Sequence, residues 1–183
     1  HWGDFKKITL SSKTNTNILQ IYNKTKNWLQ TYTSIPRDMR ELFHASYQSF
    51  LWNECVKQIL KQKVPKQIFP VSYALGQLFF YKKRDENSEF PFAFQTIGPK
   101  LKPQPHEEEI ITHLLNKEEI TLEELDLKNI TGNDFGVRER KMIVIPKDLE
   151  VHTKEDDELN KNRFKLTLVF SLPRGSYATV LLK

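Results

Sequence analysis

Residues 36–63 of the chain, PRDMRELFHASYQSFLWNECVKQILKQK, predict one long helix. Pro36 suits the first turn of a helix, where its missing N–H breaks no hydrogen bond. Pro65 lies just beyond Lys63 and cannot continue the helix. Between these limits the apolar residues recur every three or four positions, which is typical of a helix with one wide buried face. This stripe consists of Met39, Leu42, Phe43, Tyr47, Phe50, Leu51, Cys55, Ile59 and Leu60.

Two further segments have helical spacing. Asn15–Tyr32 predicts a helix on the N-terminal side, with one apolar stripe. Residues 105–117, PHEEEIITHLLNK, predict a short helix on the other side. Its inward residues are Ile110, Ile111, Leu114 and Leu115. Thr121 and Glu124 follow with the spacing of a capping box, which marks the start of another helical turn.

Extended segments separate and follow these helices. Residues 71–83, VSYALGQLFFYKK, predict a strand or hairpin with Gly76 at the bend, and residues 92–98 predict another strand. Three prolines between positions 99 and 105 predict an irregular connection. Residues 141–146, KMIVIP, predict a buried strand, and residues 152–162 a charged turn. In residues 163–171 the side chains that point to one face alternate with those that point to the other, which predicts one regular strand. Helices followed by strands and short helices give the fold class α+β.

Composition restricts the class of protein. The 183 residues are 38% hydrophobic and 28% charged, which is typical of a globular domain. They contain no apolar run of about 18 residues, so we expect no membrane partner. One cysteine excludes an internal disulfide and favours the cytoplasm. A net charge of +5 favours a polyanion such as RNA only weakly, because a solvated lysine-rich surface gives the same balance.

Two groups of residues have the side-chain types of catalytic sites, but their spacing or position argues against catalysis. His106, Glu109 and His113 lack the His-Glu-x-x-His spacing of a zinc protease, so we predict no metal site. Cys55 with His44 as its base would make a nucleophile, and a small cytosolic enzyme that uses this thiol is one alternative. Cys55 lies on the apolar stripe, however, where a cysteine behaves as a small hydrophobe.

Two basic or turn-forming segments remain as candidate sites. The cationic residues Lys100, Lys102, Arg138, Arg140 and Lys141 could grip phosphate, although a solvated hairpin tip explains them as well. In residues 171–179, SLPRGSYAT, Pro173 ends sheet pairing and Gly175 permits a tight turn. Ser176 is a natural N-cap that leaves amides for an anionic group, and Tyr177 offers a ring for stacking. An ordinary strand-to-helix turn is the alternative.

Residues 170–183, FSLPRGSYATVLLK, closely resemble the C-terminal signature of the tRNA pseudouridine synthase D (TruD) family. Residues 35–54, IPRDMRELFHASYQSFLWNE, resemble the family's Ala-Tyr-Gln-Ser-Tyr-Leu-Trp/Phe-Asn helix. TIGPKL at 96–101 and GVRERKMIVIPKDLEV at 136–151 occur in the expected order and spacing. The resemblance covers the chain from about Ile35 to Lys183.

The resemblance implies a fold and an activity. It implies an insertion domain at 35–150 and the end of a catalytic domain at 151–183, after an N-terminal helical segment or linker at 1–34. Residues 163–171 would be a strand that returns to the mixed sheet of the catalytic domain. The family isomerises a uridine in the D-arm of tRNA, of the U13 type, without cofactor or metal. We expect a cytoplasmic monomer, with a non-catalytic RNA-binding or protein-interaction module as the alternative.

The resemblance also implies which residues line the substrate cleft. These are Phe170, Leu172, Pro173, Gly175, Ser176, Tyr177, Ala178 and Thr179, and Arg174 joins the cations that could contact RNA. The reaction needs an aspartate in a Gly-x-Lys-Asp-x-x-Ala-x-Thr-x-Gln context, and Asp4, Asp38 and Asp134 have other neighbours. We therefore expect no catalytic residue in this chain, an inactive chain by itself, and a nucleophilic aspartate upstream.

Overall fold

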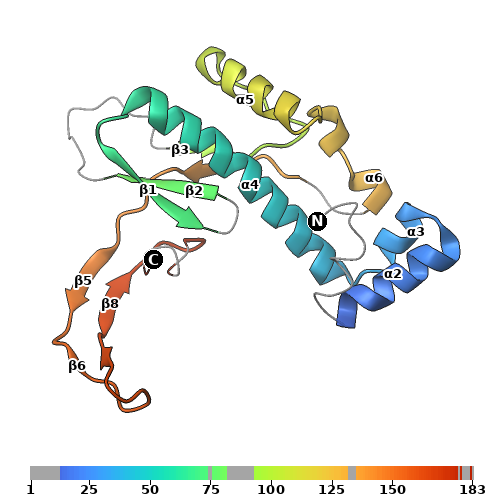
Figure 1. Cartoon of the computed structure of the whole chain (residues 1–183). Coiled ribbons are helices and arrows are strands. Elements are labelled where there is room, and N and C mark those ends of the chain that lie inside the picture. Colours follow the sequence, from blue (N-terminus) through green and yellow to red (C-terminus); the bar gives the residue numbers. More distant parts are fainter. Residues whose placement is uncertain are drawn as a thin grey trace. The chain divides into compact units, whose positions relative to one another are not determined.

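The computed structural model describes residues 13–73, 76–81, 93–131, 135–176, 178 and 182. It is a mixed α+β structure of helices and small two-stranded sheets, which confirms the predicted fold class (Figure 1). In chain order the elements are α2 Lys13–Thr25, α3 Trp28–Thr33, α4 Arg37–Lys63, β1 Ile68–Tyr73, β2 Gly76–Tyr81, β3 Ala93–Gln95, α5 Pro105–Lys117, η1 Glu123–Leu125, α6 Lys128–Thr131, β4 Glu139–Lys141, β5 Lys147–Val151, β6 Glu155–Asp156, β7 Phe164–Lys165 and β8 Leu168–Ser171.

The chain divides into two compact units. We call residues 1–59 and 95–139 the helical unit, and residues 60–94 and 140–183 the hairpin unit. The sequence-based boundaries after residues 34 and 150 concern domains of the intact protein, and they stay a prediction.

Helix α4 has the predicted limits. It begins at Arg37, directly after Pro36, and Val64 still donates its N–H to the Leu60 carbonyl at 2.9 Å where the helix ends. The predicted apolar stripe is buried in the second half of the helix, where Leu51 and Cys55 are fully buried. In the first half Leu42 and Phe43 remain exposed. Full burial of the apolar residues of α4 therefore begins near the middle of the helix.

Helix α5 provides the other side of the core of the helical unit. Its four predicted inward residues are all buried. Ile110 and Leu114 of α5 line a small cavity of about 170 Å³ together with Glu54 and Gln58 of α4, so the two helices lie side by side (Figure 1). The buried apolar side chains of this unit are Leu51, Trp52, Cys55, Val56, Ile59, Ile97, Leu101, Ile110, Ile111, Leu114, Leu115, Leu125 and Phe135.

Local signals for helix starts and stops gave one confirmed and one wrong prediction. The capping box is present, because Thr121 N–H donates to Glu124 Oε2 at 2.8 Å and Glu124 N–H donates to Thr121 Oγ1 at 3.3 Å. The single helix predicted over Asn15–Tyr32 is wrong, because α2 ends at Thr25 and α3 starts at Trp28. The break has a physical cause: the Asn27 side chain accepts the Gln30 N–H at 2.9 Å and caps a new helix.

The hairpin unit contains the predicted β1–β2 hairpin. The two strands are antiparallel, and Tyr73 pairs with Gly76, whose φ is +127°. β5 pairs antiparallel with β8, and β6 with β7 (Figure 1). The predicted charged turn lies between β6 and β7, where Asp157 Oδ1 accepts the N–H groups of Leu159 and Asn160.

Two strand predictions need correction. The buried strand predicted at 141–146 is wrong: β4 ends at Lys141, Val144 and Ile145 are exposed, and β5 begins only at Lys147. Pro146 has no N–H to donate to a neighbouring strand, so it interrupts pairing there. The continuous strand predicted at 163–171 is divided into β7 and β8. The return of residues 163–171 to the mixed sheet of a catalytic domain stays a prediction.

Candidate nucleic-acid interface

Gln48 connects two loops in the helical unit. Its side-chain Nε2 donates to the carbonyl of Ile97 at 2.8 Å and to the carbonyl of Gly136 at 3.0 Å. His44, Gln48, Leu51 and Cys55 lie at helical spacing on the inner face of α4, which places the amide between the two loops. We call residues 96–102 the first loop and residues 135–138 the second loop.

The two loops also bond to each other. Thr96 N–H donates to the Arg138 carbonyl and Arg138 N–H donates to Thr96 Oγ1, both at 2.9 Å. The Thr96 hydroxyl in turn donates to the Gly136 carbonyl at 2.8 Å. The backbones are so close that a Cβ on Gly98 would lie 2.0 Å from the Phe135 carbonyl oxygen. Only glycine fits at position 98, because it has no Cβ.

The predicted cations fall into two groups. Lys100 and Lys102 are exposed on the first loop, and Arg138 is exposed on the second. The structure therefore brings these three cations onto two loops that are bonded together. Among the residues that the structure describes, none of the three forms an ion pair. Arg140, Lys141 and Arg174 belong to the hairpin unit, so they are not assigned to the same surface.

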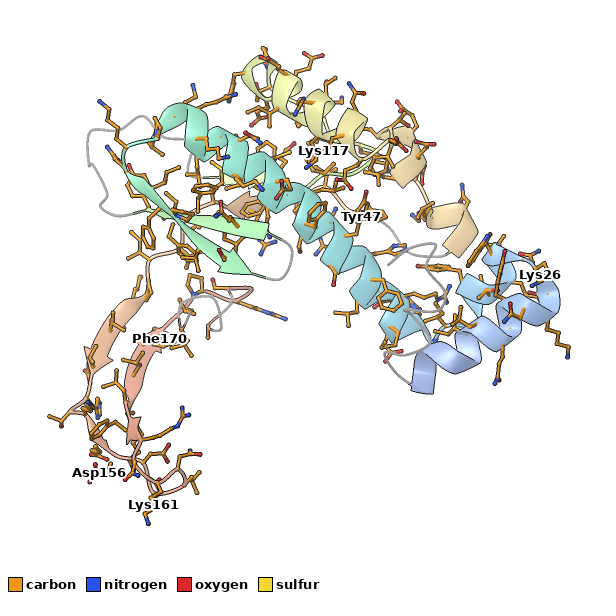
Figure 2. The ribbon with its side chains drawn as sticks, in the orientation of Figure 1. Lys26, Tyr47, Lys117, Asp156, Lys161 and Phe170 are labelled. Carbon is orange, nitrogen blue, oxygen red and sulfur yellow. The ribbon has the colours of Figure 1, made fainter. Side chains whose placement is uncertain are left out.

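An aromatic cluster packs Phe135 of the second loop against α4. The His44 ring stacks on Phe135 with centroids 4.9 Å apart, and Tyr47 meets Phe135 edge-on at 6.4 Å. Tyr47 lies midway along α4 (Figure 2). His44 Nε2 is hydrogen-bonded to the Tyr32 hydroxyl at 2.5 Å. Burial, together with the nearby Arg40 guanidinium, lowers the pKa of His44 from its usual 6.5, so the ring is neutral at pH 7.

This lowered pKa predicts a pH-dependent stability. In the unfolded chain His44 takes up a proton near pH 6.5, whereas the folded protein resists protonation until a lower pH. The stability is therefore complete above pH 6.5 and falls as the pH drops through that value towards the folded pKa. We expect the urea concentration at the midpoint of unfolding to be lower at pH 5.5 than at pH 7.5.

The matched variants are His44→Gln and His113→Gln, because His113 is an exposed residue of α5. In His44→Gln the unfolding midpoint should change less between pH 7.5 and pH 5.5 than in the wild type. In His113→Gln the change should be close to that of the wild type. An equal fall in all three proteins would show that protonation of His44 does not contribute.

The closing turn is a tight turn between Pro173 and Ser176. Ser176 N–H donates to the Pro173 carbonyl at 3.1 Å, and Gly175 has φ +87° at the third position, where this kind of turn needs a positive φ. Phe170 is half-buried on β8, just before the turn (Figure 2). Leu172 and Ser176 are also half-buried, whereas Pro173, Arg174 and Ala178 are exposed.

The assignment of the closing turn to a substrate cleft stays a prediction. Tyr177 and Thr179, which the sequence also suggested, lie outside the described residues. The described part of the turn presents a fixed backbone, one cation and half-buried apolar side chains. These are elements that could orient a nucleotide that has left its stack.

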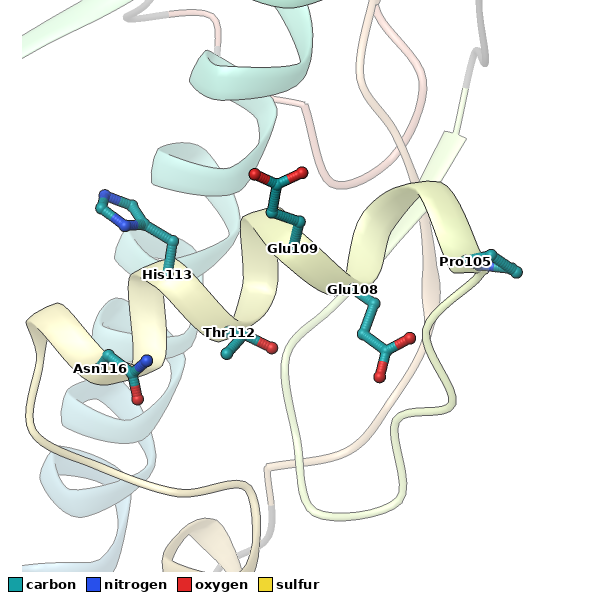
Figure 3. Close-up of a pocket in the computed structure, with 6 residues that line it drawn as sticks. All are labelled: Pro105, Glu108, Glu109, Thr112, His113 and Asn116. Carbon is teal, nitrogen blue, oxygen red and sulfur yellow. The ribbon is translucent and has the colours of Figure 1, made fainter.

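The hollow along α5 offers no comparable chemistry. It is lined by Pro105, Glu108, Glu109, Thr112, His113 and Asn116, all from one helix (Figure 3). Within the part of the chain that the structure describes, no group of three or more His, Cys, Asp or Glu residues is placed to hold a metal ion. The described helices also include none long and apolar enough to cross a membrane.

Cys55 is unsuited to nucleophilic chemistry. Its side chain is fully buried, and burial together with the nearby carboxylates of Glu54 and Glu107 raises its pKa to about 12. The thiolate is the reactive form, so this thiol is inert at pH 7. This agrees with the structural role predicted from its place on the apolar stripe.

Sequence reasoning missed the residues that join the two loops. Gln48 belongs to the helix motif and Thr96 to the TIGPKL motif, but neither motif marks these residues, or Phe135, as functional. One signal was available. His44 and Gln48 are polar residues on the same helix face as Leu51 and Cys55, and a buried polar side chain needs a partner.

Comparisons with known proteins agree with the motifs. The family model described as tRNA pseudouridine synthase D (TruD) matches residues 78–183, more than half of the chain. A protein of Methanocaldococcus jannaschii named "Probable tRNA pseudouridine synthase D 2" is 37% identical, with 100% of this chain aligned to 46% of that protein. A relative from Methanococcus maripaludis, "Probable tRNA pseudouridine synthase D 1", is 31% identical over 100% of this chain and 49% of its own length.

A bacterial relative extends the comparison. The tRNA pseudouridine synthase D of Leptospira interrogans is 27% identical over 100% of this chain and 47% of its own length. This chain thus spans about half the length of the curated relatives it matches. No solved structure matches it. These relatives are all named as synthases that modify tRNA. The chain belongs to the tRNA pseudouridine synthase D family.

Proposed function

We propose that the intact protein is a tRNA pseudouridine synthase that isomerises a uridine in the D-arm of tRNA, at the U13 position. The family match over residues 78–183 is the observation that carries this proposal. The order of the four motifs along the chain supports it. We also propose that the enzyme acts as a monomer in the cytoplasm. The single cysteine, which favours a reducing compartment, supports the cytoplasm, and the net charge of +5 is compatible with binding of tRNA.

The chemistry requires a carboxylate that these 183 residues do not provide in the family's sequence context. During the reaction the bond between N1 of the base and C1′ of the ribose breaks, the base turns, and C5 bonds to C1′. C5 then loses its proton to solvent and N1 takes one up, so that the product is an isomer of uridine. An aspartate must be held within bonding distance of the nucleotide for this. We propose that a segment outside these residues supplies it, so that this chain alone is inactive.

The closing turn and the basic loops have separate roles in this proposal. The turn at Pro173–Ser176 would orient the flipped uridine through backbone groups and the half-buried side chains of Phe170 and Leu172. Lys100, Lys102 and Arg138 would contact phosphates of the tRNA, and Arg140, Lys141 and Arg174 are proposed to do the same from the hairpin unit. No cofactor or metal takes part in the proposed reaction.

Release of tritium tests this proposal. The C5 hydrogen of uridine is lost to water when pseudouridine forms, so tRNA transcribed with [5-³H]uridine reports each turnover. We expect the intact protein to release tritium and the 183-residue chain by itself to release none. Release by the chain alone would contradict the proposed external aspartate.

The same assay addresses the alternative module. Tight binding of the tRNA without any release of tritium by the intact protein would contradict the synthase. It would favour a non-catalytic RNA-binding protein that has kept the family's fold.

A further inference from the structure

The hydrogen bonds around Gln48 form one connected network that joins the two loops to α4. The Gly136 carbonyl accepts from both Gln48 Nε2 and Thr96 Oγ1. The Thr96 hydroxyl also accepts the backbone N–H of Arg138. Polar groups shut away from water cost stability unless they are bonded, and here each group satisfies another.

The position of the network relative to the surface is informative. Arg138 is bonded through both its N–H and its carbonyl to Thr96, so its backbone cannot move without breaking two hydrogen bonds. Its guanidinium turns back over Gly136, because a Cβ on that glycine would lie 3.7 Å from Arg138 Nε. Lys100 and Lys102 are exposed on the same loop as Thr96. These bonds therefore hold together the backbones of the two loops that carry the exposed cations.

We propose that Gln48 is a positioning residue for tRNA binding, which holds the two loops in register so that Arg138 and the lysines of the first loop meet successive phosphates of the tRNA. This inference rests on the proposed function. Gln48 does not touch the RNA. It acts through the carbonyl oxygens of Ile97 and Gly136.

The chemistry of an amide explains why glutamine stands at this position. Its NH₂ group has two hydrogens, so it can donate to two carbonyl oxygens at once. A leucine of similar size fills the space but leaves both carbonyls without this donor. The two loops would then keep the Thr96 bonds and the pairing of β3 with β4 beside them, but they would lose their hydrogen bonds to α4. We expect the cations on the loops to be held less firmly as a result.

A double-mutant cycle in the intact protein tests the proposal, with affinity for unmodified tRNA transcript measured at several salt concentrations. We expect Arg138→Gln to weaken binding by about tenfold, which is the effect of one hydrogen bond to a charged group. Its plot of log affinity against log salt should become shallower by about 0.7 to 0.9, the effect of one lost phosphate contact. Gln48→Leu should reproduce both changes.

The double variant is decisive. If Gln48 acts through Arg138, it should bind about as weakly as the weaker single variant, and not about a hundredfold more weakly than the wild type. Multiplying losses, or an unchanged salt dependence in Gln48→Leu, would overturn the proposal and indicate a purely structural glutamine. Gln58→Leu is the control, because it makes the same replacement at a residue that lines the α4–α5 cavity. This variant should bind like the wild type.

A second variant guards against misfolding of Gln48→Leu. Thr96→Val keeps the shape of the side chain but removes the hydroxyl that joins Gly136 and Arg138, so it should flatten the salt dependence in the same way. Failure to do so would overturn the proposal. The proposed function fails separately: tRNA binding with this coupling but without tritium release would contradict the synthase and keep the positioning role.

Discussion

Replacing Gly175 by valine is expected to lower kcat/KM for pseudouridine formation by at least about 100-fold in the intact protein, the loss that a misplacement of about 1 Å can cause. Gly175 has φ +87°, a conformation that a β-branched residue avoids. Among the residues that the structure describes, none has an atom within 4 Å of a Cβ at this position, so none of them is pushed aside. The expected loss therefore comes from a changed backbone path between Pro173 and Ser176, while the protein remains folded.

Gly76→Val is the matched control. Gly76 also has a positive φ, +127°, and no atom of the described part of the chain would lie within 4 Å of its Cβ. It differs in its place, because it lies at the β1–β2 hairpin. Both variants should have similar unfolding temperatures, and only Gly175→Val should lose turnover. Unchanged turnover in Gly175→Val would remove the closing turn from the proposed cleft.

Gly98→Ala is expected to have the largest effect on stability, a loss of about 3 kcal/mol or more, at the top of the usual range for overpacking. The added methyl group would lie 2.0 Å from the Phe135 carbonyl oxygen, well inside van der Waals contact, and that oxygen belongs to the backbone and cannot turn away. The two loops must separate, which would also break the bonds around Thr96. Urea unfolding gives the free energy, and tRNA affinity should fall with it.

Gly136→Ala makes the same chemical change on the opposite loop. Of the described residues, the new methyl group there would meet the Arg138 side chain alone, at 3.7 Å, which is an ordinary contact with a flexible group. We expect a change within about 1 kcal/mol, the usual scale of a Gly→Ala change without strain. Equal stability of the two variants would show that the loops are not held as closely as the structure places them.

The sequence predicts the local elements of this fold well. The periodic stripe and the two prolines placed α4 between Arg37 and Lys63, and the four inward residues of α5 are buried as expected. These patterns work because each depends on neighbours within one or two turns of the chain. The break between α2 and α3 at Asn27 was not predicted, because the apolar spacing continues across it. The cap that causes the break depends on one side chain.

Contacts between distant segments were not predictable in the same way. The partners of the Gln48 side chain are backbone carbonyls 49 and 88 positions further along the chain, and a carbonyl carries no mark of its role in the sequence. The segment 141–146 failed for a related reason. Its apolar run indicates burial, but burial of a strand requires partners on either side, which a local pattern does not specify.

We propose that the intact protein makes pseudouridine in the D-arm of tRNA, and carbodiimide modification followed by primer extension would detect it. The adduct on pseudouridine stops reverse transcription one nucleotide before the modified site. After incubation of unmodified tRNA with the intact protein, we expect one new stop, at uridine 13, which disappears when that uridine is replaced by cytidine. A stop elsewhere in the tRNA, or no stop with an intact protein that binds it, would contradict the claim.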